Sequence, residues 1–167
     1  MRLADVELIF RALNDAEVRY LVVGGLAVNA HGYVRITVDA DIVLQLQEEN
    51  ILRAMNALSA KGYQPLVPVA ASEFADPEKR RSWITEKNMI VFQMRHPDRD
   101  STRLDIFVAE PFDFDDAYAR ALWEGVHGVR SPIAPYEELV KLKQAAGRPQ
   151  DLLDLQQLEI IRQKRGK

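Results

Sequence analysis

Two adjacent glycines interrupt the most apolar stretch of the chain, Tyr20-Leu-Val-Val-Gly-Gly-Leu-Ala-Val28. Its first four residues are typical of a short buried strand, and the Gly24-Gly25 pair that follows marks a tight turn. Residues 26–31 then predict a short helix. Because the stretch is far shorter than a membrane span, it predicts a core element of a protein without a membrane segment.

The remaining hydrophobic pattern alternates between helical and strand-like segments and then becomes rich in strands. It predicts helices at 6–13, 48–61, 113–123, 136–146 and 150–164, and strands at 41–45, 83–85, 89–95, 103–108 and 129–133. Residues 72–81 fit a helix or an irregular connection, and a turn at 97–100 predicts that the strands on either side form a hairpin. The order predicts an α/β (α+β) fold, in which helices pack on a mixed β-sheet and the C-terminus is helical.

Composition narrows the class of protein. The 167 residues include no cysteine, which excludes disulfide scaffolds, Cys-ligated zinc, iron–sulfur clusters and thiol nucleophiles. The length fits a single domain, 1–167, with the helices of residues 136–165 packed on it. A formal net charge of −3 argues against a general nucleic-acid coat. Asp5 and Glu7 interrupt the first apolar residues and argue against a signal peptide, so we expect a cytoplasmic protein.

The Gly24-Gly25 pair has two interpretations. Glycines at such a turn let a phosphate approach the backbone, and the next N–H groups lie at the positive end of a helix. By itself, however, the pair favours a plain strand-to-helix turn. The sequence contains no G-x-G-x-x-G and no Gly-Lys-Ser/Thr, which excludes a dinucleotide-binding fingerprint and a P-loop.

Asp39-Ala-Asp41 runs directly into the predicted strand. If that strand begins at Asp39, its period of two places both carboxylates on one face and Ala40 and Ile42 on the other. Burying two adjacent carboxylates without a partner costs several kcal/mol, which a divalent cation would offset. A solvated pair in a loop before the strand is the alternative.

Asp105 lies within the apolar segment Thr102-Arg-Leu-Asp-Ile-Phe-Val108. Leu104, Ile106 and Val108 alternate as a core face, so Asp105 belongs to the opposite face with Arg103. The alternative is the exposed face of an edge strand on which Asp105 pairs with an arginine. Together with the first two carboxylates, Asp105 would complete a two-metal site.

Two longer motifs accompany these residues. Val23-Gly-Gly-Leu-Ala-Val28 is followed by Arg35-Ile-Thr-Val-Asp-Ala-Asp-Ile-Val43, and Lys143-Gln-Ala-Ala-Gly-Arg-Pro-Gln-Asp-Leu-Leu-Asp154 lies near the end of the chain. With the lone Asp105, they resemble the nucleotidyltransferases of the DNA polymerase β type. The closer resemblance is to small bacterial members related to the AbiEii-like proteins of type IV toxin–antitoxin systems, and it spans residues 18–158.

The resemblance implies a Mg²⁺-dependent nucleotidyltransferase, which moves a nucleoside monophosphate from a nucleoside triphosphate (NTP) to a hydroxyl. Asp39 and Asp41 would bind a Mg²⁺ ion that grips the triphosphate, and Asp105 would help them hold a second ion that activates the acceptor. The implied catalytic and metal-binding residues are therefore Asp39, Asp41 and Asp105. The implied nucleotide-binding residues are Gly24, Gly25, Leu26, Arg35, Lys143 and Arg148.

The roles of the cationic residues stay open at this point. Lys143 and Arg148 fit phosphate contacts, but they equally fit a solvated lysine at a helix end and an arginine paired with Asp151 or Asp154. Arg35 fits either a phosphate contact or a brace for the aspartate pair.

The acceptor also stays open among RNA, protein and small molecules, as does a toxin or antitoxin partner. The alternative function is a catalytically silent nucleotide-binding or antitoxin-like module that acts by binding a partner. The presence of all three carboxylates favours the enzyme.

Overall fold

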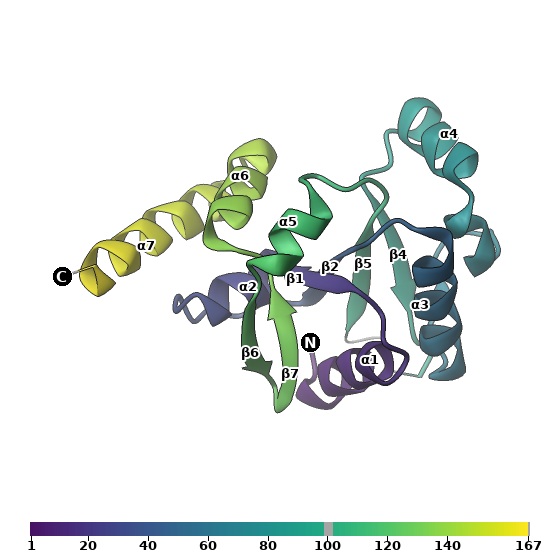
Figure 1. Cartoon of the computed structure of the whole chain (residues 1–167), viewed down its shortest axis with the longest axis horizontal. Coiled ribbons are helices and arrows are strands. Elements are labelled where there is room, and N and C mark those ends of the chain that lie inside the picture. The colour runs from purple at the N-terminus through teal and green to yellow at the C-terminus, as the bar shows by residue number, and fades with distance from the viewer. Residues whose placement is uncertain (99–101, 167) are drawn as a thin grey trace.

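A computed structural model describes residues 1–98 and 102–166 (Figure 1). In these residues, seven strands form one sheet in the order β3-β4-β5-β2-β1-β7-β6. The strands are β1 (Tyr20–Val23), β2 (Asp39–Leu44), β3 (Gln64–Pro65), β4 (Val91–Arg95), β5 (Arg103–Phe107), β6 (Leu122–Val126) and β7 (Val129–Ile133). The pairs β2–β5 and β1–β7 are parallel and the others are antiparallel. The mixed sheet predicted from the sequence is confirmed.

Helices surround this sheet. They are α1 (Leu3–Asp15), α2 (Gly24–Ala30), α3 (Glu48–Ala60), the 3-10 helix η1 (Ala71–Ala75), α4 (Pro77–Lys87), α5 (Phe114–Ala119), α6 (Tyr136–Ala146) and α7 (Pro149–Arg165). In Figure 1, α6 and α7 form a helical arm at the C-terminal end, as predicted. In the described residues, no helix is both long and apolar enough to cross a bilayer.

Different helices cover the two faces of the sheet. On one face, fully buried side chains such as Ile42, Phe92 and Ile106 pack in the larger core, to which α1, α3, η1 and α4 contribute. On the opposite face, a smaller core joins residues of β1 and β2 to α5 and α6; Phe114 and Leu142 belong to it. This second face is the one that carries the aspartates.

The predicted hairpin is confirmed, because β4 and β5 pair antiparallel with Gln93 opposite Asp105. Pro97 and Asp98 begin a turn after β4. The remainder of the predicted turn at 97–100 lies outside the described residues.

Two predictions of secondary structure were wrong. Residues 83–85 lie within α4, which begins where the Asp76 side chain accepts hydrogen bonds from the N–H groups of Glu78 and Lys79. Trp83 is buried there because its ring stacks on Phe92 of the sheet. The helix predicted at 113–123 ends at Ala119. The chain then forms β6, which the sequence did not predict and which pairs with β7 across a turn.

Candidate active site

The three predicted carboxylates lie on one face of two neighbouring strands. In the parallel pair β2–β5, Asp41 lies opposite Asp105, and Asp39 lies opposite Arg103. Ala40 and Ile42 point into the core on the other face and are completely buried. Because β5 lies between β4 and β2, the alternative that Asp105 lies on an edge strand is wrong.

The glycine turn lies directly beside these carboxylates. β1 is antiparallel to β2, and Val23 lies opposite Asp41, so the chain enters α2 next to the aspartate pair. Gly24 has a φ of +63°, and a Cβ atom at this position would collide with the Asp41 carboxylate. A Cβ atom on Gly25 would collide with the Thr37 side chain. Both positions therefore require glycine, and the plain-turn interpretation does not explain why the turn closes so tightly on a carboxylate.

The charge on this face is unfavourable without a cation. Burial raises the pKa of Asp41 to about 6, and repulsion from Asp105 and Asp39 adds to the shift, while Lys143 and Arg148 oppose it. Burial also raises the pKa of Asp105, with a further contribution from Asp39. A divalent cation would remove this repulsion, so the residues present fit a metal ion.

Neighbouring side chains hold two of the carboxylates. Arg103 Nε donates to Asp39 Oδ1 at 3.0 Å, and Gln93 Nε2 donates to Asp105 Oδ1 at 3.1 Å. As the side chains stand in the described residues, no three acidic or histidine groups converge into a metal cage. A shared cation therefore requires these side chains to move closer together, and Arg103 occupies only Oδ1 of Asp39.

A second charged cluster lies where α6 meets α7. Lys143 is almost completely buried, and its Nζ lies 2.8 Å from both Asp151 Oδ1 and Asp154 Oδ2. The interpretation of Lys143 as a solvated helix-end residue is therefore wrong. Burial acts to raise the pKa of Asp151 and Asp154, but their hydrogen bonds to cationic side chains outweigh it and lower both values.

Two arginines complete this cluster. Arg148 Nε donates to Asp151 Oδ2 at 2.7 Å, which is the pairing considered from the sequence. Arg35 makes two bonds of 2.7 Å to Asp154 rather than to Asp39 or Asp41. Arg35 Nη1 also lies 3.2 Å from where a Cβ atom of Gly25 would be, so this guanidinium adjoins the glycine turn. The cluster thus places three cations and two anions beside Asp41.

Sequence reasoning missed Gln93 and the role of Arg103. Both would follow from the β4–β5 hairpin and the β2–β5 pairing, since these registers put Gln93 opposite Asp105 and Arg103 opposite Asp39. The hydrophobic pattern identified the strands but contained no signal for their register.

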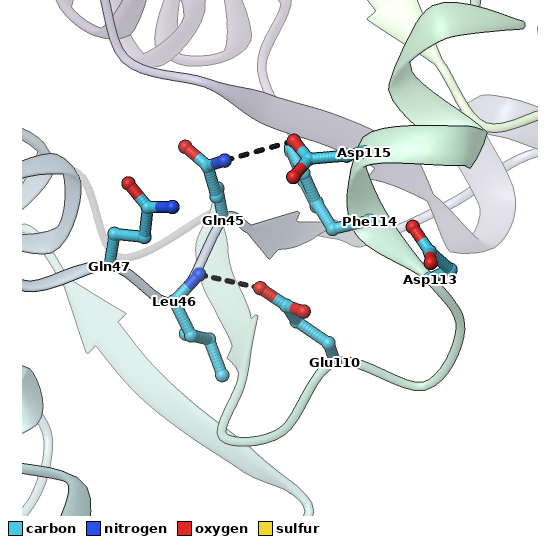
Figure 2. Close-up of a pocket in the computed structure, with 7 residues that line it drawn as sticks. All are labelled: Gln45, Leu46, Gln47, Glu110, Asp113, Phe114 and Asp115. Carbon is cyan, nitrogen blue, oxygen red and sulfur yellow. Dashed lines mark hydrogen bonds between the residues drawn. The ribbon is translucent and has the colours of Figure 1, made fainter.

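A cavity of about 380 Å³ lies at the opposite end of β2 (Figure 2). In Figure 2, the Gln45 amide donates to Asp115, and the N–H of Leu46 donates to Glu110. Gln45 and Leu46 follow the last residue of β2, whereas Asp39 is the first. This cavity is therefore separate from the three carboxylates.

No known protein family and no curated protein matches the chain by sequence. Its fold is similar to that of the lincosamide antibiotic adenylyltransferase LnuA with bound lincomycin, with a TM-score of 0.63 and 15% identity over 95% of this chain and 96% of that one. It is also similar to ANT(2″)-Ia in complex with adenylyl-2″-tobramycin, with a TM-score of 0.57 and 12% identity over 97% and 95% of the two chains. A solution structure of ANT(2″)-Ia gives a TM-score of 0.57 and 15% identity over 97% and 89%. The chain therefore has the nucleotidyltransferase fold that its sequence motifs resemble.

Proposed function

We propose that this protein is a Mg²⁺-dependent nucleotidyltransferase that transfers a nucleoside monophosphate from an NTP to a hydroxyl of a small molecule. The observation that carries the proposal is the register of Asp41 opposite Asp105, with Asp39 on the same face. The proteins of similar fold support the choice of a small acceptor, since LnuA is a lincosamide adenylyltransferase and ANT(2″)-Ia is bound to an adenylylated tobramycin. By the same analogy ATP is the expected donor.

In this reaction the acceptor oxygen attacks the α-phosphorus, the bond from that phosphorus to the bridging oxygen breaks, and pyrophosphate leaves. Mg²⁺ held by Asp39, Asp41 and Asp105 would neutralise the triphosphate and lower the pKa of the acceptor hydroxyl. The protein supplies position and charge. Gly24 and Gly25 let the turn pack directly against Asp41 and Thr37, and the first N–H groups of α2, which have no acceptor within their own helix, lie beside the carboxylates for contact with the phosphates.

The cationic cluster has a supporting role in this proposal. Arg148 is its most exposed member and is the candidate for a direct phosphate contact. Lys143 is fully engaged by two aspartates, so we assign it to the electrostatic field around Asp41 and to the positioning of α7. Arg35 joins the glycine turn to the same cluster through Asp154.

The AbiEii-like relationship and a toxin or antitoxin partner stay predictions that rest on the sequence motifs 23–28, 35–43 and 143–154, of which the closing motif is the one specific to the smaller subgroup. In the structure this motif forms the α6–α7 corner. A silent nucleotide-binding module remains the alternative that the test below separates from an enzyme.

The test compares ATP labelled at the α-phosphate with ATP labelled at the γ-phosphate, each incubated with Mg²⁺, the protein and a small-molecule extract. Nucleotidyl transfer moves only the α-label to the acceptor, and the γ-label leaves in pyrophosphate. Phosphoryl transfer moves only the γ-label to the acceptor, and the α-label stays in ADP. We expect α-label transfer by the wild type and none by Asp41→Asn. Tight binding of Mg²⁺ and ATP without transfer to any acceptor would favour the binding module instead.

A further inference from the structure

The face that carries the aspartates is covered along β1 and β2, and the smaller core also contacts one side of the half-buried Phe107 at the end of β5. The rest of β5, together with β4 and β3, is open on this face. α5 and α6 pack against β1 and β2 in the smaller core. On β4 and β5, the side chains that share a face with Asp105 are half-buried or exposed, whereas those of the opposite face, such as Met94 and Leu104, are completely buried. This uncovered surface, which we call the open platform, begins at the third carboxylate.

Three apolar side chains form one part of the open platform. Val91 lies opposite Phe107 in the β4–β5 register. The N–H of Leu66 donates to the carbonyl of Gln93, which continues the β3–β4 ladder and places Leu66 on the same face as Gln93. Leu66 is 42% exposed, which is unusual for a leucine that follows a paired strand. The platform therefore offers an apolar surface beside the Gln93 amide.

Two arginines form the other end of the open platform. By strand alternation, Arg95 follows Gln93 on this face and Arg103 precedes Asp105. Both are exposed, and Arg95 forms no ion pair with any carboxylate among the described residues. Arg103 bonds to Asp39, and binding of a cation by Asp39 would release its guanidinium toward the platform. Arginine side chains bind carboxylate and phosphate groups through paired hydrogen bonds.

The position of the glycine turn indicates whether the open platform binds the NTP or the acceptor. Gly24 and the α6–α7 cluster lie on the β1 side of Asp41, and Asp105 lies on the other side. If the phosphates occupy the glycine side, the acceptor must approach from the side of Asp105, because attack opposes the departing pyrophosphate. The open platform is thus continuous with the place where the acceptor hydroxyl reacts.

We propose that the open platform binds the acceptor, and that this acceptor is a small hydroxylated molecule with an apolar part and an acidic group. The apolar part lies on Leu66, Val91 and Phe107, and the carboxylate or phosphate pairs with Arg95 and Arg103. This inference rests on the proposed function and adds the chemical class of its second substrate. It also separates this chain from an enzyme for a polycation such as tobramycin, which two exposed arginines would repel.

The experiment uses two probes that differ only in the acidic group: 4-nitrophenyl β-D-glucuronide and 4-nitrophenyl β-D-glucoside. Each is titrated by NMR into the full chain saturated with Mg²⁺ and a non-hydrolysable ATP analogue. We expect the glucuronide to bind about tenfold more tightly than the glucoside, and tobramycin to bind more weakly than the glucuronide. Glucose 6-phosphate, tested in the same way, distinguishes a preference for phosphate from one for carboxylate.

The matched variants are Arg95→Glu and, as a control, Arg81→Glu on α4, where the exposed Arg81 pairs with Glu78. Arg95→Glu should lower affinity for the glucuronide about tenfold and leave the glucoside within twofold. Arg81→Glu should change neither.

Equal affinity for the two glycosides, no binding of either, tighter binding of tobramycin, or binding of a short RNA in place of the glucuronide would each overturn the proposal. Failure of the Mg²⁺–nucleotide analogue to bind at all would instead contradict the proposed function. The two failures are therefore distinguishable.

Discussion

Asp41 and Asp105 lie opposite each other on the parallel strands β2 and β5, with both carboxylates on the face beside the glycine turn. Burial raises the pKa of both groups; repulsion from Asp105 and Asp39 adds to the shift of Asp41, and repulsion from Asp39 adds to that of Asp105. The metal-free protein therefore carries an electrostatic strain at this point of the sheet, and its stability should depend on the ionisation of Asp41.

The first prediction concerns Asp41→Asn. The folded pKa of about 6 lies above the ordinary value of 3.8, so folding takes up a proton between these pH values, and stability falls as the pH rises through that window. Above pH 6 the wild type bears the full cost. Asp41→Asn should then raise the free energy of unfolding by about 1–3 kcal/mol at pH 7.5, and the gain should shrink toward pH 4. Urea unfolding at several pH values, without metal, measures this.

The matched control is Asp15→Asn, which removes the same charge from an exposed position at the end of α1. It should leave stability within about 0.5 kcal/mol at every pH. A destabilised Asp41→Asn protein at pH 7.5 would contradict the strain assigned to this pair.

The second prediction separates binding from chemistry at Asp105. In the proposed function, Asp39 and Asp41 would hold the nucleotide-bound cation without it, whereas activation of the acceptor would require all three carboxylates. Asp105→Asn should therefore keep nucleotide affinity within a small factor and lose most nucleotidyl transfer, as expected for an interaction made mainly in the transition state. Calorimetry with Mg²⁺ and nucleotide measures the affinity, and the α-label assay measures the transfer. If binding and transfer disappear together, the division of roles is wrong.

The third prediction tests the buried Lys143. Lys143→Met leaves Asp151 and Asp154 buried without their shared cation, and should lower the free energy of unfolding by about 3–5 kcal/mol. Lys141→Met is the control, since exposed Lys141 pairs with Glu138 at the surface of α6 and its loss should cost less than about 1 kcal/mol. Normal stability of Lys143→Met together with lost nucleotide binding would assign Lys143 to the phosphates instead.

The fourth prediction concerns Gly24. Gly24→Ala adds a Cβ atom that meets the Asp41 carboxylate, at a φ of +63°. Gly128→Ala has a comparable φ of +83° but meets no atom within 4 Å, so it carries the backbone strain alone. Both variants should lose about 1 kcal/mol of stability from strain. Only Gly24→Ala should also abolish the thermal shift produced by Mg²⁺ and ATP, and equal shifts in the two variants would refute the role of this turn.

The strands that carry the carboxylates could be predicted because their apolar residues alternate clearly. Asp39 and Asp41 on one face, and Asp105 opposite the apolar face of its own strand, follow from that period of two. That the two strands are neighbours was expected only from the family resemblance. The partners of these groups could not be predicted, because Arg103 and Gln93 reach them only through the register between strands. β6 was missed because three of its five residues are exposed, and it depends on pairing with β7 rather than on burial.

The burial of Lys143 at the α6–α7 corner could not be predicted for a different reason. The sequence places Lys143 near a glycine and a proline at a helix end, where a lysine is ordinarily solvated. Its burial depends on α7, which begins at Pro149 and brings two aspartates onto the lysine. That contact belongs to tertiary packing, so no local pattern contains it.

The pairing of β2 with β5 also has a consequence for how the chain folds. Asp39 and its partner Arg103 are 64 residues apart, so these strands meet only after a long loop closes. The carboxylates approach one another at that same moment. Their repulsion opposes the docking of β5, and Arg103 relieves it only at Asp39. We expect this repulsion to slow the pairing of β5 with β2, and a divalent cation held by the carboxylates, as in the proposed function, would remove it.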